Sequence, residues 1–191
     1  MMKNIAVLLL LFVINNLSAQ ESYKIYSWES AQKLGKDTVY GITFAKTKFD
    51  SIPADLINYT NLRYLDLSKH KLTSLPSNFS NLSKLEVLNL EKNNFDLFPL
   101  QICALKNLDS LIINRNDFST FPVQIGYLKN LEYLDVWATP IMSFPPAFDE
   151  LKSLKKVDAR GITHGKNFQE GIKERMPWVH FIFDLPCNCA D

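Results

Sequence analysis

Residues 62–84 read LRYLDLSKHKLTSLPSNFSNLSK, and residues 85–107 repeat the same pattern as LEVLNLEKNNFDLFPLQICALKN. Each stretch has apolar residues at positions 1, 4, 6, 11, 14, 18 and 21 and a proline at position 15. A fixed period of this length indicates a solenoid of stacked coils. The prolines that mark the 23-residue period are Pro53, Pro76, Pro99, Pro122 and Pro145.

The spacing inside one unit predicts how a coil is built. Positions 4 and 6 are apolar and alternate with polar neighbours, which is typical of a strand with one buried face. The proline lacks an N–H donor, so it suits an irregular segment away from the sheet. One strand recurs in every coil, so the strands must pair in parallel through right-handed crossovers. The units begin at Val39, Leu62, Leu85, Leu108, Leu131 and Leu154.

These positions resemble the leucine-rich repeat family in its 23-residue form, LxxLxLxxNxLxxLPxxLxxLxx, over residues 39–176. The nearest subclass is the Ras-suppressor-like type. The resemblance implies an α/β fold: a right-handed solenoid with a curved parallel sheet on its concave face and short helical or irregular convex segments. It also implies a role in protein–protein contact, although a fold alone names no partner.

The family pattern implies an asparagine at position 9 whose amide bridges the backbones of neighbouring coils. Asn93 and Asn116 match this position. Thr47, His70 and Thr139 depart from it but can each still form a side-chain hydrogen bond, whereas Ile162 cannot. We therefore expect a ladder that is intact in the middle of the solenoid and weak at both ends.

The chain before the repeats predicts a targeting segment. Lys3 precedes an apolar run from Ile5 to Ile14, and residues 15–19 (NNLSA) follow and end in the small residue Ala19. This is typical of a secretory signal peptide, cleaved here between Ala19 and Gln20. The apolar run is too short to span a bilayer, so we expect no membrane span in the mature chain. The protein is then secreted, either to a periplasm or to the cell exterior.

A stack of coils exposes an apolar face at each end and needs caps. The expected organisation is a signal peptide (1–19), an N-terminal cap (20–38), five full repeats and one degenerate repeat (39–166), and a C-terminal cap with a cysteine tail (167–191). The first cap contains a helix from Trp28 to Leu34, with Ser27 as N-cap and Gly35 at its end. The second contains a helix over 167–176 and a closing strand over 178–183.

The charge of the mature chain narrows the choice of partner. Removing residues 1–19 lowers Lys+Arg from 21 to 20, against 20 Asp+Glu, so the net charge is zero. A neutral, evenly mixed chain argues against nucleic acid or an anionic membrane as the main partner. Another protein or a peptide is the expected partner, and a monomer the expected state.

Three cysteines remain in the mature chain. Cys103 lies beside a buried position and is expected to be a small buried hydrophobe. Cys187 and Cys189 form a CxC sequence near the C-terminus. They can form a local disulfide or bond to another chain, and two cysteines without a third ligand are a weak metal motif.

The candidate partner-binding residues lie at positions 3, 5 and 7 of each unit, which point away from the core. Core packing does not require aromatic or aliphatic residues there, and aromatic and Arg side chains are enriched in binding hot spots. Single exposed apolar groups are also ordinary on any surface. The candidates on the concave face are Tyr64, Asp66, Val87, Asn89, Ile112, Asn114, Tyr133, Asp135, Trp137 and Arg160.

No catalytic set is apparent. Asp135 and Asp158 share position 5 in adjacent coils and offer a weak cation or acid–base site, but no further acid converges on them. The sequence contains no catalytic motif, so we predict no catalytic residue, no metal and no cofactor. A secreted binding module is the leading hypothesis, an adhesive protein that oligomerises through the CxC tail is the alternative, and an enzyme is third.

Overall fold

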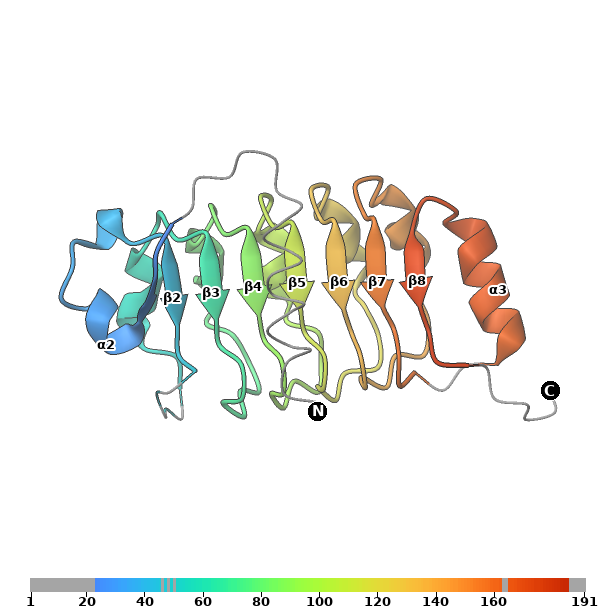
Figure 1. Cartoon of the computed structure of the whole chain (residues 1–191), viewed down its shortest axis with the longest axis horizontal. Coiled ribbons are helices and arrows are strands. Elements are labelled where there is room, and N and C mark those ends of the chain that lie inside the picture. Colours follow the sequence, from blue (N-terminus) through green and yellow to red (C-terminus); the bar gives the residue numbers. More distant parts are fainter. Residues whose placement is uncertain (1–22, 46, 48, 50, 163–164, 186–191) are drawn as a thin grey trace.

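The computed structural model describes residues 23–45, 47, 49, 51–162 and 165–185. Its strands form one parallel sheet in chain order, and they lie side by side along the long axis of the molecule (Figure 1). This confirms the predicted α/β solenoid. The strands are β1 (Ile25–Ser27), β2 (Gly41–Thr43), β3 (Tyr64–Asp66), β4 (Val87–Asn89), β5 (Ser110–Ile112), β6 (Tyr133–Asp135), β7 (Lys156–Asp158) and β8 (His180–Ile182).

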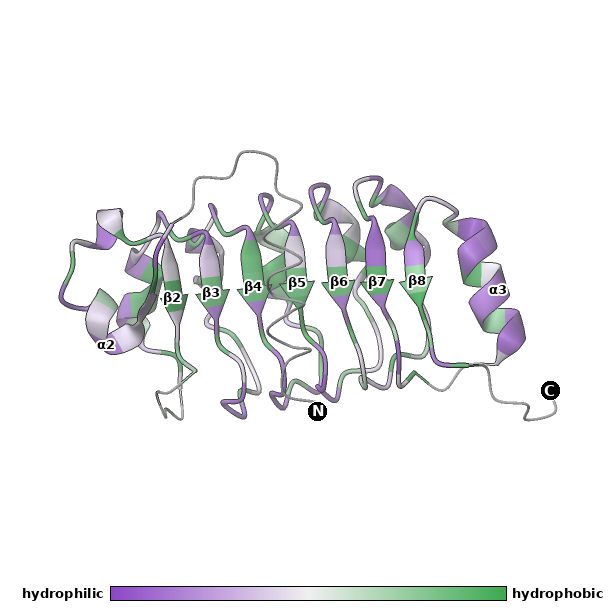
Figure 2. Ribbon diagram, in the orientation of Figure 1, coloured by the Kyte–Doolittle hydropathy of each residue, from purple (hydrophilic) through white to green (hydrophobic). Residues whose placement is uncertain are grey.

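The register of the strands follows the repeat. The position-4 residues pair with one another from strand to strand, and none of them exposes any surface. They produce the hydrophobic band that crosses the middle of the strands in Figure 2. Because side chains alternate along a strand, positions 3 and 5 must face away from the core. The position-4 residues are Ile42, Leu65, Leu88, Leu111, Leu134 and Val157.

Short 3₁₀ helices form the side opposite the sheet (Figure 1). In four of the coils the repeating proline is the N-cap, so the helix starts directly after it. Proline fixes φ and has no N–H to leave unpaired, which suits this position. The helices are Ala54–Asn58, Phe79–Asn81, Leu100–Ala104, Val123–Tyr127 and Pro146–Glu150.

The N-terminal cap differs from the prediction. Helix α2 (Trp28–Ala31) begins as expected after Ser27, whose hydroxyl accepts from the Ser30 N–H, but it ends at Ala31 rather than Leu34. Gly35 does not end this helix, because it is the N-cap of a 3₁₀ turn, Lys36–Thr38. Strand β1 was not predicted; it extends the sheet by one strand ahead of the repeats.

The C-terminal cap is close to the prediction. Helix α3 (Lys166–Arg175) connects β7 to β8, and β8 pairs in parallel with β7. The helix lies beyond the last strand, and its surface is largely hydrophilic (Figures 1 and 2). Gln169 donates to the Asp184 carbonyl just after the edge strand (3.3 Å). Within the described residues, no helix is long and apolar enough to cross a membrane.

The asparagine ladder joins the middle coils. Asn93 accepts from the N–H groups of His70 (3.1 Å) and Leu72 (2.9 Å). Its amide donates to the carbonyls of Leu67 (2.9 Å) and Leu90 (3.0 Å). Asn116 repeats this arrangement one coil later, accepting from Phe95 and donating to Leu90 and Ile113. One amide therefore satisfies several buried backbone groups that lie in two coils.

The ladder weakens away from these coils. Thr47 donates to the Glu29 carboxylate (2.7 Å) rather than to a neighbouring coil. His70 stacks on Phe49 with ring centroids 4.1 Å apart, and its Nε2 is buried without a partner. Thr139 does not form the side-chain hydrogen bond that its hydroxyl allows, and its Oγ1 is buried without a partner. A threonine side chain is too short to reach the groups that the longer asparagine amide contacts.

Replacing Asn93 by Ala is expected to lower the free energy of unfolding by about 3–5 kcal/mol, because the N–H groups of His70 and Leu72 and the Leu67 carbonyl lose their partner at about 1–3 kcal/mol each, partly offset by water. The Leu90 carbonyl keeps its bond from Asn116. Urea denaturation followed by circular dichroism measures the change. Asn94→Ala is the control, since Asn94 is exposed next to it and such changes stay within about 0.5 kcal/mol. Equal stability of the two variants would contradict the ladder.

A second repeated feature follows each strand. Position 8 adopts positive φ in each coil where the structure describes it, with values of 69° at Lys69, 55° at Lys92, 54° at Arg115, 51° at Ala138 and 74° at Gly161. This left-handed conformation turns the chain out of the sheet. It costs a non-glycine residue about 1–2 kcal/mol, and only the last coil has glycine there.

Ala138→Gly is expected to raise the free energy of unfolding by about 0.5–1 kcal/mol, since the relief of left-handed strain exceeds the entropy that glycine adds to the unfolded chain. The matched control is Ala54→Gly, at an exposed residue whose φ is not positive. That change should lower stability by up to about 1 kcal/mol. Thermal or urea unfolding compares them, and opposite signs are the expected result.

Candidate protein-binding face

The open sheet face consists of the side chains at positions 3, 5 and 7, which the strands present away from the core. All ten candidate residues lie at these positions. Tyr64, Val87, Asn89 and Asn114 are buried. The partly exposed candidates, which offer more surface to a partner, are Asp66, Ile112, Tyr133, Asp135, Trp137 and Arg160.

Position 5 has a structural task that the sequence analysis missed. The side-chain oxygens of Asp66, Asn89 and Asp135 each accept a hydrogen bond from the backbone N–H two residues later, at 2.9–3.0 Å. Thr43 and Asp158 do the same at 3.2 and 3.3 Å. In these Asx and ST turns, the side chain binds the backbone of its own coil, so the same turn can form in one coil after another. The recurrence of Thr, Asp or Asn at position 5, in every coil but the one with Ile112, was the available signal.

The partly exposed aromatic residues of the face belong to β6 and the turn after it. The guanidinium of Arg115 lies over the Trp137 ring, 4.1 Å from its centroid, and also 3.8 Å from Glu91. The ammonium of Lys156 lies 5.6 Å from the Tyr133 ring centroid. These cation–π contacts hold the rings in place. Ile112, on the neighbouring strand β5, pairs with Asp135 of β6. We refer to four partly exposed residues in this region together as the β6 patch: Ile112, Tyr133, Trp137 and Arg160.

Arg160 does not carry a free charge in this patch. It binds Asp158 through two hydrogen bonds, from Nε (2.9 Å) and Nη2 (2.6 Å). Asp158 is only 2% exposed. A bidentate Arg–carboxylate pair is strong and geometrically fixed, so Arg160 neutralises the charge of Asp158. Of the two carboxylates considered as a cation or acid–base site, only Asp135 is left without a cation.

Asp135 lies at the centre of the face and differs from Asp158. It accepts from the Asn114 amide (2.6 Å) and from the Trp137 N–H (3.0 Å), but it has no ion pair with a described Lys or Arg. Desolvation raises the pKa of Asp135 to about 6, and the charges of Asp158 and Glu91 act in the same direction. Burial of a carboxylate without a cation destabilises its charged form.

Other titratable groups do not assemble a reaction centre. Desolvation also raises the pKa of Asp109 to about 6, with Glu86 and Glu132 adding to the effect. Burial raises the pKa of the Cys103 thiol to about 11, as expected of an inert core cysteine. Across the described part of the chain, no three His, Cys, Asp or Glu side chains converge to hold a metal ion. His164, Cys187 and Cys189 lie outside the described residues.

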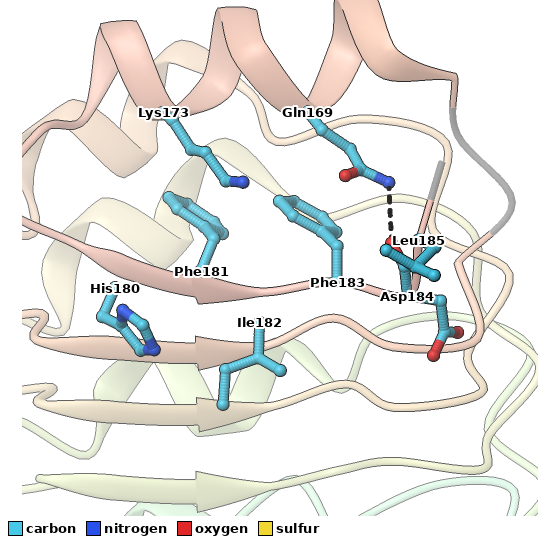
Figure 3. A pocket seen from close by; sticks show the side chains of 8 residues that line it. All are labelled: Gln169, Lys173, His180, Phe181, Ile182, Phe183, Asp184 and Leu185. Carbon is cyan, nitrogen blue, oxygen red and sulfur yellow. Dashed lines mark hydrogen bonds between the residues drawn. The ribbon is translucent and has the colours of Figure 1, made fainter. Parts of the chain in front are cut away.

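A groove of about 380 Å³ lies at the C-terminal cap, between α3 and β8. Figure 3 shows Lys173 and Gln169 pointing from the helix toward Phe181 and Phe183 of the closing strand. The ammonium of Lys173 lies 5.6 Å from the Phe183 ring centroid. These contacts close the end of the core, so we assign the groove to capping rather than to the candidate face.

The fold defines a solenoid repeat protein with an open sheet face. A family model described as "Leucine-rich repeat region" matches residues 48–176. This span covers more than half of the sequence, and the chain belongs to the leucine-rich repeat family. The sequence matches no curated protein significantly.

Among solved structures, an LRR protein of Leptospira interrogans is similar, with a TM-score of 0.60 and 23% sequence identity over 78% of this chain and 43% of that protein. The chain therefore spans less than half the length of that structure. At this identity the likeness concerns the fold alone.

The raised pKa of Asp135 predicts a pH-dependent gain from Asp135→Asn. An Asp with a folded pKa above its ordinary value destabilises the native state as pH rises through about 6, and the penalty is absent below about 4. The variant should therefore be more stable than the parent at pH 8, by up to about 3 kcal/mol, and equal to it near pH 4. Urea titrations at both pH values measure this, and a constant difference would contradict it.

Proposed function

We propose that this protein binds another protein or a peptide through its open sheet face, with the β6 patch as the contact centre. One observation carries the proposal: Ile112, Tyr133 and Trp137 are partly exposed on the face opposite to the core. Large apolar side chains with a polar surround mark interaction sites more often than chance exposure does. Tyr64, Asp66, Val87, Asn89 and Asn114 would line the same face.

Family membership supports the same function at a coarser level. Leucine-rich repeats suggest a protein-binding module, and the family points to a repeat protein that acts without catalysis. The 23-residue period supports the Ras-suppressor-like subclass. Secretion as a monomer after cleavage near Ala19 is part of the proposal and rests on the pattern of residues 1–19, which lie outside the described residues.

Oligomerisation through the CxC tail is the alternative. It rests only on Cys187 and Cys189, whose structure is not described. No described contact favours it, whereas the β6 patch favours binding.

Substituting both aromatic residues of the patch, Trp137→Ala and Tyr133→Ala, is expected to reduce capture of the partner at least tenfold, because hot-spot truncations cost about 2 kcal/mol or more. Affinity capture from the source organism's culture, with quantitative mass spectrometry, measures the loss. Circular dichroism confirms that the variant stays folded.

Tyr127→Ala is the matched control. Tyr127 is also exposed beneath a cation, with Lys106 4.6 Å from its ring centroid, but it lies on the helical side of the solenoid. Its loss should leave capture unchanged. Capture that survives the double substitution, or that falls equally in the control, would remove the patch from the proposal.

A further inference from the structure

The centre of the open face has more hydrogen-bond acceptors than donors. Asn114 is only 5% exposed, and its Oδ1 has no hydrogen-bond partner. Its amide nitrogen is used, because it donates to Asp135 at 2.6 Å. A buried acceptor without a donor costs about 1–3 kcal/mol, so a missing donor would stabilise this position.

Asp135 lacks a cation beside the same acceptor. Its two hydrogen bonds come from Asn114 and Trp137, and an ionised carboxylate can accept about four. The neighbouring cations are used elsewhere: Arg160 binds Asp158, and Arg115 lies between Glu91 and the Trp137 ring. The described residues therefore offer no further donor to Asn114 Oδ1 or to the Asp135 carboxylate.

Fold requirements do not explain the charge. Where a position-5 side chain binds the turn, an uncharged oxygen is enough, as Asn89 shows at 2.9 Å. Asp158 also occupies this position but has its own arginine. The turn at Asp135 would therefore form equally well with an uncharged asparagine. The raised pKa of Asp135 shows that burial makes its negative charge unfavourable.

The surroundings match a long cationic side chain. Tyr133 and Trp137 flank Asp135 along the same strand and turn. Lys and Arg carry an apolar stem that packs on aromatic surface and a head that donates several hydrogen bonds. A carboxylate from a partner would instead meet Glu91, Asp135 and Asp158, which repel it.

We infer that the partner inserts a lysine or arginine side chain between Tyr133 and Trp137, where its head donates to the partly exposed Asp135 carboxylate beside Asn114. This inference rests on the proposed function and specifies the partner as a basic protein or peptide segment.

The first experiment uses two isosteric changes in the affinity capture. Asp135→Asn keeps the turn bond, as Asn89 shows, and removes the charge; it should weaken capture at least tenfold. Asp96→Asn makes the same change at an exposed residue outside positions 3, 5 and 7, and should leave capture unchanged. Capture that depends on Trp137 and Tyr133 but not on Asp135 would overturn the inference and leave the proposed function standing.

The second experiment needs no identified partner. N-acetyl-arginine amide is titrated into the full mature protein while NMR follows the Trp137 indole and Asn114 amide signals. The neutral isostere N-acetyl-citrulline amide is the control ligand. We expect millimolar binding of the arginine compound, at least tenfold weaker binding of citrulline, and the same loss in Asp135→Asn.

Binding of the arginine probe should also weaken as pH falls below about 6, because protonation removes the Asp135 charge. The charged groups near Asp135 are Glu91, Asp158 and Arg160. Arg115 and Lys156 also lie close by, on the Trp137 and Tyr133 rings. Equal affinity for arginine and citrulline, or pH-independent binding in the parent protein, would overturn the inference.

Discussion

The structure depends on one constraint, the backbone hydrogen bonding between neighbouring coils. To form these bonds, the chain must place an equivalent residue beside the previous strand every 23 residues. Parallel strands pair only with a fixed register, and here each strand residue lies opposite its equivalent one coil later. A single inserted residue would move the next strand's core side chains to the open face. The position of a residue in the repeat therefore decides whether it is buried, turns the chain or meets solvent.

The sequence predicted what this constraint dictates through burial. Leu65, Leu88 and Leu111 had to be buried in register because their period allows no other common interior, and the proline had to lie off the sheet because it lacks a donor. The helix and closing strand of the C-terminal cap were also predictable, since Pro177 ends the helix and a run of aromatic and β-branched residues over 178–183 favours a strand.

The remaining features depend on backbone geometry and on contacts between coils, which have weak sequence signals. Strand β1 is three residues long, and only its pairing with β2 makes it a strand. Left-handed conformation at Lys92 or Arg115 is not suggested by the residue type. Thr139 can satisfy its hydroxyl only if a neighbouring backbone group lies within reach, and that distance is set by the adjacent coil.

The same separation of roles explains where function can arise in this fold. Position 4 admits only apolar residues, whereas position 5 accepts Thr43, Asn89, Ile112 or Asp135 with the strand unchanged. A site on the open face can therefore change residue by residue without loss of the solenoid. A charge placed there without a cation lowers stability and has no structural benefit over asparagine. In the proposed complex, a partner's donor would satisfy the carboxylate that the coil itself leaves incomplete and so offset its energetic cost.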